Sequence, residues 1–509
     1  MGFISRFAIN RLVNSTDPRP RPFSFWSEKP PTPNDSPISD YTSWNSLTDR
    51  EWSSRHLRPA SDEFMGQLPF AELIADTPRN QDGTFPADVV AQVTTLHKRS
   101  NERVNDRSSV LFSFFAQWFT DSFLRFNSAD RRKNTSNHEI DLCQIYGLTD
   151  KTSRILRTLA DGKLLTREVN GEEYLPLLFD AQHQPIGDFN NLPYIDKINF
   201  FLAKFPADRR DYYYATGLDR GNTTIGYTAI STVFLREHNR LCDELRERTG
   251  WTDDERLFQT ARNILIVLLL KVVVEDYISH IAGSSIFRVE PGFAEKQKWY
   301  RTNWMAAEFD LLYRWHPLVP DKFTLDGTSH GHMDYRFNNV LLEQYGVSAV
   351  LSAASGQAAG KIGLHNTPDF LLPAEYEAIK MSRDFKLRSF NEYRQRFGLR
   401  RVKSFKKLTE DEGLQNELES LYGDIDKLDF LTGLFAEQSN GKGLFGKLMT
   451  TMVACDAFSQ ALTNPLLSKY VFNENTFTRY GMKVIEETSS FEDIARRNVA
   501  GELSTSFSV

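Results

Sequence analysis

One histidine stands between a tryptophan and a proline in the segment EFDLLYRWHPLVP (308–320), three residues after a tyrosine. A neutral imidazole such as that of His316 is a good axial ligand for haem iron. A tyrosine as close as Tyr313 could exchange an electron with an oxidised haem. The other interpretation, and the more frequent one for a single histidine in an apolar helix, is a core residue with satisfied hydrogen bonds.

Pro317 disfavours helical backbone at the residue before it, so His316 is expected at or just past a helix end, facing a cavity. Helical periodicity dominates the chain from about residue 85, and strand signals are few and short. Apolar residues recur at i, i+3 and i+4 in segments 86–104, 108–126, 223–250, 254–283, 373–388, 390–398 and 416–437. The segment 223–250 ends on a glycine, which is a helix stop. The sequence predicts a mainly α-helical protein with one large catalytic body over residues 61–509.

Composition excludes several classes of protein. The 509 residues carry a net charge of −6 with both signs mixed, which argues against a nucleic-acid partner. The 38 phenylalanines indicate a thick aromatic core or an apolar cavity. The three cysteines, Cys143, Cys242 and Cys455, are too far apart in sequence for a disulfide framework or a paired metal motif, which fits a reducing compartment.

Residues 1–60 differ from the rest. Residues 17–37 are proline-rich and polar and are expected to form an extended arm. Within residues 1–15 an apolar stripe predicts a short amphipathic helix, which either contacts a membrane peripherally or packs on the protein surface. The N-terminus lacks the apolar region of a signal peptide, and the run 264–274, interrupted by Lys271, is too short for a transmembrane helix. The expected location is cytoplasmic or peripheral to a membrane; the sequence does not indicate an oligomeric state.

The segment 308–323 resembles the proximal haem segment of the cyclooxygenases (prostaglandin endoperoxide synthases). Further stretches resemble the family in the same order: 114–126 (the distal haem helix), 140–165, 232–245, 254–266, 272–283 (the channel-lining helix), 389–399 and 418–430. Over about residues 85–470 the chain is identified as a member of the animal haem peroxidase and cyclooxygenase superfamily. The resemblance implies that superfamily's helical fold and a haem b cofactor.

The resemblance assigns roles to four residues. His316 matches the proximal iron ligand, and Tyr313 matches the tyrosine whose radical takes hydrogen from a fatty acid. Tyr422 matches a residue near the proximal histidine, where it would orient that ligand. Arg220, sixteen residues before Arg236, has the spacing of the distal arginine of mammalian peroxidases; otherwise it is a surface arginine in a polar loop.

The distal helix departs from the family pattern. Gln117 is present, but Asp121 stands four residues later, one helical turn away, where the family has a histidine. That histidine moves a proton between the two oxygens of a peroxide. An exposed aspartate, with a pKa of about 3.9, is a poor base near neutral pH, although burial would raise that pKa. We therefore expect weak peroxidase activity.

Two further departures concern the same region. Ser122 stands where mammalian peroxidases have a calcium-binding aspartate, so no calcium is predicted there. Thr223 stands at the position of their ester-linking glutamate, so no covalent ester to haem is expected there.

The resemblance implies that the segment 272–283 lines a fatty-acid channel. Its lining residues would be Tyr277, Ile278, Ile281 and Ala282, although an ordinary helix core gives the same apolar pattern. Ser284 replaces the tyrosine at the cyclooxygenase channel mouth, and the epidermal-growth-factor-like disulfide module is missing. The chain therefore resembles bacterial and cyanobacterial fatty-acid dioxygenases more than animal prostaglandin synthases.

The resemblance implies a haem-dependent fatty-acid dioxygenase. A tyrosyl radical at Tyr313 would take hydrogen from a polyunsaturated fatty acid, and O2 would add to give a hydroperoxide. Three alternatives stay open: a peroxidase with Asp121 as its base, a radical oxidase of another lipid or small substrate, and a haem-binding protein without catalysis.

Overall fold

The computed structural model describes residues 3–13, 41–44, 57–58, 87–127, 131, 134–136, 139–203, 205–297, 299–300, 305–385, 387–439 and 441–509. The described chain is mainly α-helical, as predicted. The proline-rich arm and the boundary at residue 60 lie outside the described residues.

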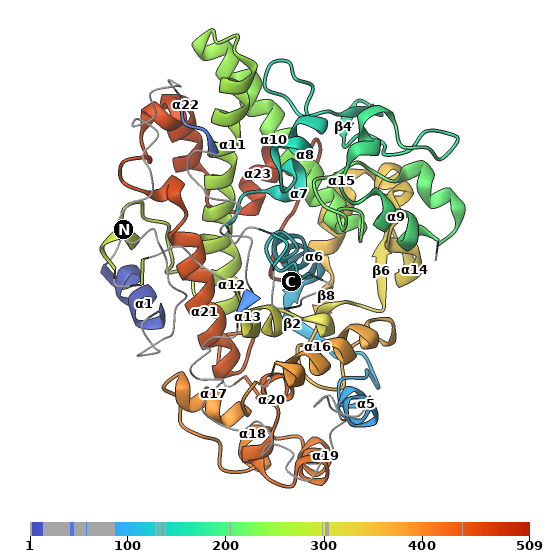
Figure 1. The fold of residues 1–509 in the computed structure, drawn as a ribbon, viewed down its shortest axis with the longest axis vertical. Helices are drawn as coiled ribbons and strands as arrows, with labels where there is room; N and C mark the ends of the chain where they lie inside the picture. Colours follow the sequence, from blue (N-terminus) through green and yellow to red (C-terminus); the bar gives the residue numbers. More distant parts are fainter. Residues whose placement is uncertain are drawn as a thin grey trace.

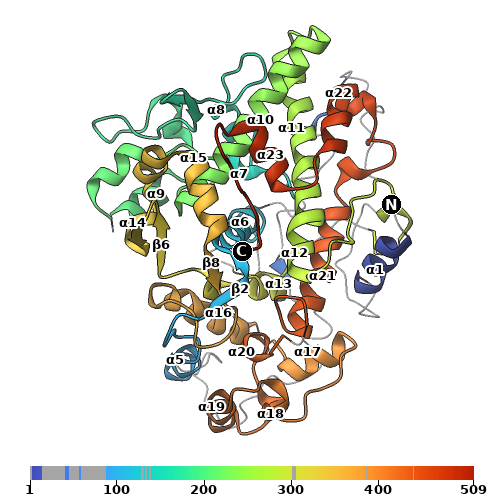
Figure 2. The ribbon, with the colours of Figure 1, turned by 180° about the vertical axis from the view of Figure 1, so that it is seen from behind.

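Helix α6 (Val110–Thr120) lies at the centre of the molecule in both ribbon views (Figures 1 and 2). It begins where the Ser109 hydroxyl accepts a hydrogen bond from the Phe112 backbone N–H, an N-cap that satisfies one of the first free amides. Nearly all of its residues are buried, because it packs against α10 (Ile225–Thr249) and α15 (Asn339–Gly356). The distal helix is therefore a rigid core element.

Two long helices form the scaffold beside α6. Helix α10 starts at its cap Thr224 and stops at Gly250, which has φ +69°, the predicted helix stop. Helix α11 (Asp254–Lys271) packs against α10 and α22 (Glu474–Glu487). The run 264–274 is buried inside the protein except at Lys271, whose ammonium donates to the Ile485 carbonyl.

A π-helical turn, η5 (Val272–Tyr277), joins α11 to α12 (Ile278–Ala282). A π turn contains an extra residue and so redirects the side chains that follow it. Gly283 then ends α12 in the left-handed conformation, at φ +62°.

The other helical elements surround this scaffold. They are α1 (Phe3–Val13), α5 (Ala87–Thr95), α7 (Cys143–Tyr146), α8 (Asp150–Ile155), η3 (Gly187–Asn191), α9 (Ile195–Leu202), η4 (Ala207–Tyr212), η6 (Ala294–Lys296), α13 (Ala307–Leu312), η7 (His316–Leu318), α14 (His332–Tyr335), η8 (Asp369–Leu371), α16 (Leu372–Asp384), α17 (Phe390–Arg396), α18 (Phe405–Leu408), α19 (Glu412–Tyr422), η9 (Ile425–Lys427), α20 (Phe430–Ala436), α21 (Lys447–Leu462), η10 (Pro465–Leu467) and α23 (Phe491–Asn498).

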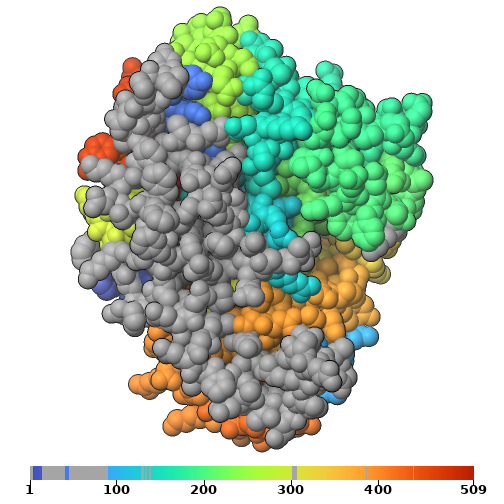
Figure 3. All heavy atoms as spheres, viewed as in Figure 1, coloured from blue at the N-terminus to red at the C-terminus, as the bar shows by residue number. Residues whose placement is uncertain are grey.

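The described strands are short and form two-stranded pairs only. The antiparallel pairs are β2 (Val104–Ser109) with β8 (Ala358–Gly360), β3 (Arg167–Val169) with β4 (Glu172–Tyr174), and β6 (Lys322–Leu325) with β7 (Thr328–Gly331); β1 (Leu57–Arg58) pairs in parallel with β5 (Met305–Ala306). Within the described residues, a single large core runs through the helical body. A small second core around Phe179, Tyr194 and Ile198 supports the lobe that contains α9, green at the upper right of Figure 3.

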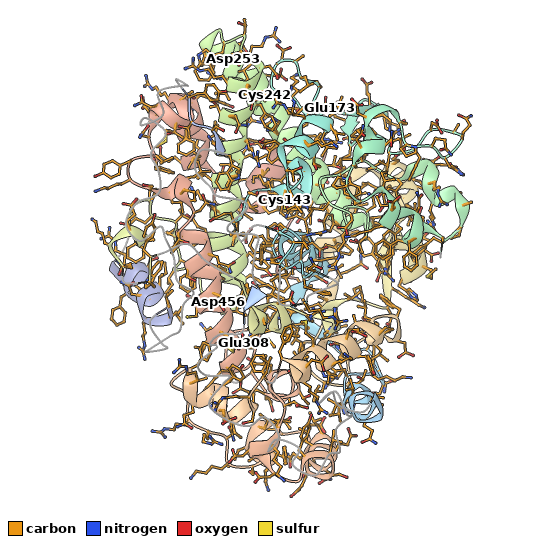
Figure 4. The ribbon with its side chains drawn as sticks, viewed as in Figure 1. Cys143, Glu173, Cys242, Asp253, Glu308 and Asp456 are labelled. Carbon is orange, nitrogen blue, oxygen red and sulfur yellow. The ribbon has the colours of Figure 1, made fainter. Side chains whose placement is uncertain are left out.

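Helix α1 packs on α21, with Ile9 and Val13 buried in the contact. Its outer face leaves Ile4 and Phe7 66% and 57% exposed. No helix of the described part of the chain has the length and apolar character needed to cross a bilayer. The three cysteines are buried, and none of them is in a disulfide bond; Figure 4 labels Cys143 and Cys242.

Candidate active site

The segment that carries Tyr313 and His316 is a short irregular connection. Helix α13 ends at Leu312, and His316 opens the 3₁₀ turn η7, so the histidine lies just past a helix end as predicted. The anchor at the start of this segment is Glu308, which is fully buried and accepts a hydrogen bond of 2.7 Å from the Tyr393 hydroxyl. In Figure 4 Glu308 lies where α13 meets the lower group of helices.

The backbone of η7 is held from the other side by Arg99. Its guanidinium donates to the carbonyls of Pro317 (3.2 Å) and Val319 (2.9 Å) and pairs with Asp321 (2.7 Å). Gly360 of β8 lies directly under the turn, where a Cβ atom would meet the Pro317 carbonyl oxygen at 1.9 Å. The turn therefore fits closely against β8.

His316 is oriented by a carboxylate. Its Nδ1 donates to Glu375 Oε1 at 2.9 Å, and Glu375 is fully buried at the start of α16. Burial raises the pKa of Glu375, but His316, His97 and the hydrogen bonds from His316 and Thr367 outweigh it and hold that pKa at about 2. Nε2 of His316 has no hydrogen-bond partner among the described residues, which leaves its lone pair available to a metal ion.

One cavity gathers the residues that the sequence singled out. Its lining includes His316 and Tyr313 from the connection after α13, Gln117 and Asp121 from the end of α6, and Arg220 from the loop before α10. These residues come from three separate parts of the chain. The resemblance assigned all five to the haem site, and they surround one space.

On the α6 side, Arg220 donates through Nη1 to Asp121 Oδ1 at 2.8 Å. Oδ2 of Asp121 is buried and has no hydrogen-bond partner. Burial raises the pKa of Asp121, although Arg220 and Arg125 lower it, and Asp121 in turn raises the pKa of Arg220. The Arg220 side chain is 48% exposed, and its guanidinium pairs with Asp121 at the lining of the cavity.

Tyr313 lies in an aromatic cluster. Its ring stacks on Trp315 with centroids 4.2 Å apart and meets Phe309 edge-on at 4.9 Å. Burial raises the pKa of the Tyr313 phenol, and Tyr277 lowers it by less. Neither the Tyr313 nor the Tyr277 hydroxyl has hydrogen-bond geometry to any described residue, so their contact is weaker than a regular hydrogen bond.

Of the expected channel residues, Tyr277 ends the π turn and the other three belong to α12. Tyr277, Ile278 and Ile281 are buried, and Ala282 is partly buried. The Tyr277 ring packs against Phe112 (5.3 Å) and Phe115 of α6. The structure therefore places the start of this segment beside the Tyr313 phenol.

The residues around the cavity fit a haem. An imidazole with a free Nε2 lies in a lining that also includes apolar side chains such as Phe114, Leu318 and Phe370. Arg336 adds a cation, with its guanidinium 4.9 Å from the centroid of the Phe370 ring. Burial lowers the pKa of Arg336, and Arg336 makes no ion pair or hydrogen bond with a described residue. A half-buried cation without a counter-ion is suited to a carboxylate, and haem b carries two.

Tyr422 and Thr223 are two further residues that the sequence analysis named. The Tyr422 hydroxyl donates to Asp429 (2.7 Å) and lies 3.2 Å from the Thr432 hydroxyl, whereas the hydrogen-bond partner of His316 is Glu375. Thr223 lines the cavity. The described residues contain no cluster of three or more His, Cys, Asp or Glu side chains that could hold a metal ion, and the absence of calcium stays a prediction.

Sequence reasoning missed Glu375 and Arg336. A signal for Glu375 exists, because it shares the i, i+3, i+4 and i+7 positions of α16 with Ala378, Ile379 and Ser382, all buried. A carboxylate on the apolar face of a helix indicates a buried partner. Arg336 carries no comparable signal, since it lies in a short connection between two helices.

Comparison with known proteins identifies the family of the chain. The family model for animal haem peroxidases matches residues 98–506. Prostaglandin G/H synthase 2 of Bos taurus is 32% identical over 489 residues, covering 95% of this chain and 76% of that protein. Prostaglandin G/H synthase 1 of Mus musculus is 33% identical over 460 residues, covering 88% and 70%.

Solved structures show the same fold at low identity. A fatty acid alpha-dioxygenase of Oryza sativa has a TM-score of 0.72 at 17% identity, covering 97% of this chain and 90% of its own. Peroxidase A of Dictyostelium discoideum has a TM-score of 0.68 at 17% identity, covering 96% and 99%. With its family model matched over most of its length, the chain belongs to the animal haem peroxidase family, a family of haem-dependent oxidoreductases.

Proposed function

We propose that this protein is a haem-dependent fatty-acid dioxygenase that works through a radical on Tyr313. The observation that carries the proposal is the position of the Tyr313 phenol, which is buried, has no hydrogen-bond partner and lines the same cavity as His316. The curated relatives named prostaglandin G/H synthases support an oxygenase of this kind.

Haem b held by His316 would supply the oxidising equivalent that removes an electron from Tyr313. Burial raises the pKa of the phenol, so Tyr313 is protonated at neutral pH and must lose a proton together with the electron; the proton would pass to solvent in the cavity that Tyr313 lines. The product is a neutral phenoxyl radical. Its stacked neighbour Trp315 and the edge of Phe309 hold the ring in place and exclude water.

The phenoxyl oxygen takes a hydrogen atom from an activated methylene of the fatty acid, which leaves a carbon radical and restores the phenol. O2 adds to the carbon radical and forms a peroxyl radical. That radical takes the hydrogen atom back from Tyr313, which yields a hydroperoxide and regenerates the phenoxyl radical. The sum is one fatty acid and one O2 converted to one hydroperoxide.

The substrate chain would lie along the segment that follows the π turn, against Ile278, Ile281 and Ala282. Tyr277 is the neighbour of Tyr313 on this side, and its ring is held by α6. This arrangement is proposed from the burial of Ile278 and Ile281 and from the position of Tyr277, at the start of the segment, beside Tyr313.

The initiating reaction with peroxide is expected to be slow. Asp121 can take a proton from peroxide at its free oxygen Oδ2, but its pKa, although raised, starts far below that of an imidazole. Arg220 further favours the charged carboxylate and thus makes it a weaker base. Weak peroxidase activity and a lag before oxygen uptake follow.

The test is Tyr313→Phe. The variant keeps the ring and its stacking on Trp315, so fold and haem binding should persist, while oxygen uptake with linoleic acid should fall to background. Tyr335→Phe is the matched control: Tyr335 lines the same cavity but its hydroxyl donates to the Pro320 carbonyl, and oxygen uptake should continue. Near-normal uptake in Tyr313→Phe would rule out the mechanism.

A peroxidase with Asp121 as its base is the second candidate, and the observation that favours it is the oxygen Oδ2 of Asp121, which has no hydrogen-bond partner and belongs to a residue that lines the cavity. A peroxidase oxidises a phenolic donor at the haem and does not need Tyr313. Guaiacol oxidation that is fast in the wild type and unchanged in Tyr313→Phe, without any oxygen uptake, would select this function.

A further inference from the structure

We propose that Glu375 is a positioning residue that gives His316 anionic character and so lowers the reduction potential of the iron that His316 would bind. The proposal rests on the haem ligation argued above and deepens it. It stands on the hydrogen bonds around one buried carboxylate.

Glu375 lies in the first turn of α16, where the positive end of the helix dipole stabilises an anion. Its Oε1 accepts two hydrogen bonds, from His316 Nδ1 at 2.9 Å and from the Thr367 hydroxyl at 3.1 Å. Because Nδ1 is the donor, the proton of the neutral imidazole is on Nδ1 and Nε2 is the basic nitrogen. The carboxylate therefore selects the tautomer that binds iron.

The second oxygen, Oε2, is buried without any hydrogen-bond donor. Nδ1 of His97 lies 4.0 Å from it, beyond hydrogen-bond range. Both ring nitrogens of His97 are themselves without partners, and its ring packs edge-on against Phe435 at 5.5 Å. With no donor on Oε2, the Thr367 hydroxyl is the one other hydrogen-bond donor, among the described residues, that shares the charge of Glu375 with His316.

A strong charge-assisted acceptor on Nδ1–H increases the basicity of the imidazole toward the metal. An electron-rich axial ligand stabilises the ferric over the ferrous iron and favours cleavage of a bound O–O bond. This chain lacks a distal imidazole and has Asp121 instead. Electron donation from the proximal side would therefore replace part of the lost acid–base assistance.

The experiment compares haem-loaded wild type with Glu375→Gln, Glu375→Asp and Glu377→Gln. Glutamine keeps size and an acceptor oxygen but removes the charge. Glu377 lies on the same helix but is exposed and pairs with Arg131, so Glu377→Gln removes one negative charge from α16 without touching His316. The readouts are the ferric/ferrous reduction potential and the iron–histidine stretching frequency of the ferrous protein, both measured without fatty acid.

Glu375→Gln should shift the potential to a more positive value and the stretch to lower frequency, while Glu377→Gln leaves both unchanged. In Glu375→Gln at least one of two further quantities, the affinity for haem and the rate of peroxide consumption, should fall by about 10- to 100-fold. Glu375→Asp keeps the charge at a longer distance, so its reduction potential and stretching frequency should lie between those of wild type and Glu375→Gln. If Glu375→Gln does not retain haem, Glu375→Asp should still show both shifts in the same directions relative to wild type.

A potential and a stretching frequency that are the same in wild type, Glu375→Asp and Glu375→Gln would overturn the proposal. Equal shifts in Glu375→Gln and Glu377→Gln would overturn it as well, because they would show a general charge effect. Neither readout involves fatty acid or O2. The Glu375 proposal can therefore fail while the dioxygenase function stands, and the dioxygenase function can fail while the Glu375 proposal stands.

Discussion

At the scale of single residues, Asp121 is the departure with the clearest chemical consequence. Replacing it by histidine restores a proton carrier with a pKa near neutrality at the end of α6. Asp121→His should raise turnover with hydrogen peroxide and a phenolic donor by about ten-fold or more. This gain is part of the roughly 100- to 10,000-fold effect that a general acid–base group typically provides. The same variant should also shorten the lag in oxygen uptake.

The pH dependence of the wild type tests the same residue. The base form of Asp121 takes the proton, and its pKa is raised by burial, so the peroxide reaction should speed up as pH rises through that pKa. Asp121→Asn cannot titrate and should lose this acidic limb. If the limb persists in Asp121→Asn, another group is the base.

Arg336 provides a prediction about cofactor binding. If its guanidinium pairs with a haem carboxylate, Arg336→Leu should bind haem b less tightly, by about 1–3 kcal/mol, the usual range for a lost charge-assisted hydrogen bond. Haem dimethyl ester has no free carboxylates. In a titration the wild type should therefore bind this ester only as tightly as Arg336→Leu binds haem b. Equal affinity of wild type for both haems would exclude this pairing.

At the scale of elements, the turn η7 depends on its close contact with β8. A methyl group on Gly360 would collide with the Pro317 carbonyl oxygen, which cannot move away because Arg99 holds the turn. Gly360→Ala should lower the free energy of unfolding by about 1–3 kcal/mol, as overpacked sites do, and weaken haem binding.

The matched control is Gly356→Ala, at the end of α15, where a new Cβ meets no atom within 4 Å. This variant should be neutral or more stable by up to about 1 kcal/mol, because alanine favours a helix. Denaturant unfolding and haem titration measure both variants. Equal behaviour of the two would show that the contact under η7 is not a constraint.

The elements also show what the sequence can and cannot predict. The helical stripes, the stop at Gly250 and the helix end before His316 follow from local rules, and each is present in the structure. The π turn has no local signal, because an apolar run such as 264–274 has the same periodicity with or without an extra residue.

The candidate site divides in the same way. Residues within recognisable segments, such as Tyr313 and Gln117, were found from sequence, whereas the contact between His316 and Glu375 joins positions 59 residues apart. Tyr422 illustrates the limit of a motif: its hydroxyl is bonded within the cluster of Asp429 and Thr432. A motif gives a position along the chain, but the direction of a side chain depends on packing.

At the scale of the whole molecule, helix α1 has one face packed on the helical body and one face exposed at the surface of the protein. Its inner face is buried on α21 and its outer face exposes Ile4 and Phe7, so the two interpretations of the N-terminal helix concern different faces. We propose that the outer face contacts a membrane, from which a fatty acid would enter.

Replacing Ile4 and Phe7 together by serine should reduce co-sedimentation with phosphatidylcholine vesicles several-fold and leave stability unchanged, because exposed side chains contribute little to folding. Ile9→Ala is the contrast: it should cost about 2–5 kcal/mol of stability and leave vesicle binding of the folded protein intact. Unchanged vesicle binding in the serine variant would assign α1 to packing alone.

Burial of the three cysteines has a consequence for how the enzyme would be inactivated by the hydroperoxide product proposed above. Each Sγ–H donates to a backbone carbonyl, at Ser122, Gly162 and Val13. Burial raises the pKa of Cys242 well above its usual range, and a thiol reacts with hydroperoxides only as the thiolate. Turnover-dependent inactivation should therefore leave three titratable thiols after unfolding, and the damage should be found on the aromatic rings around Tyr313, where a radical left without substrate can migrate.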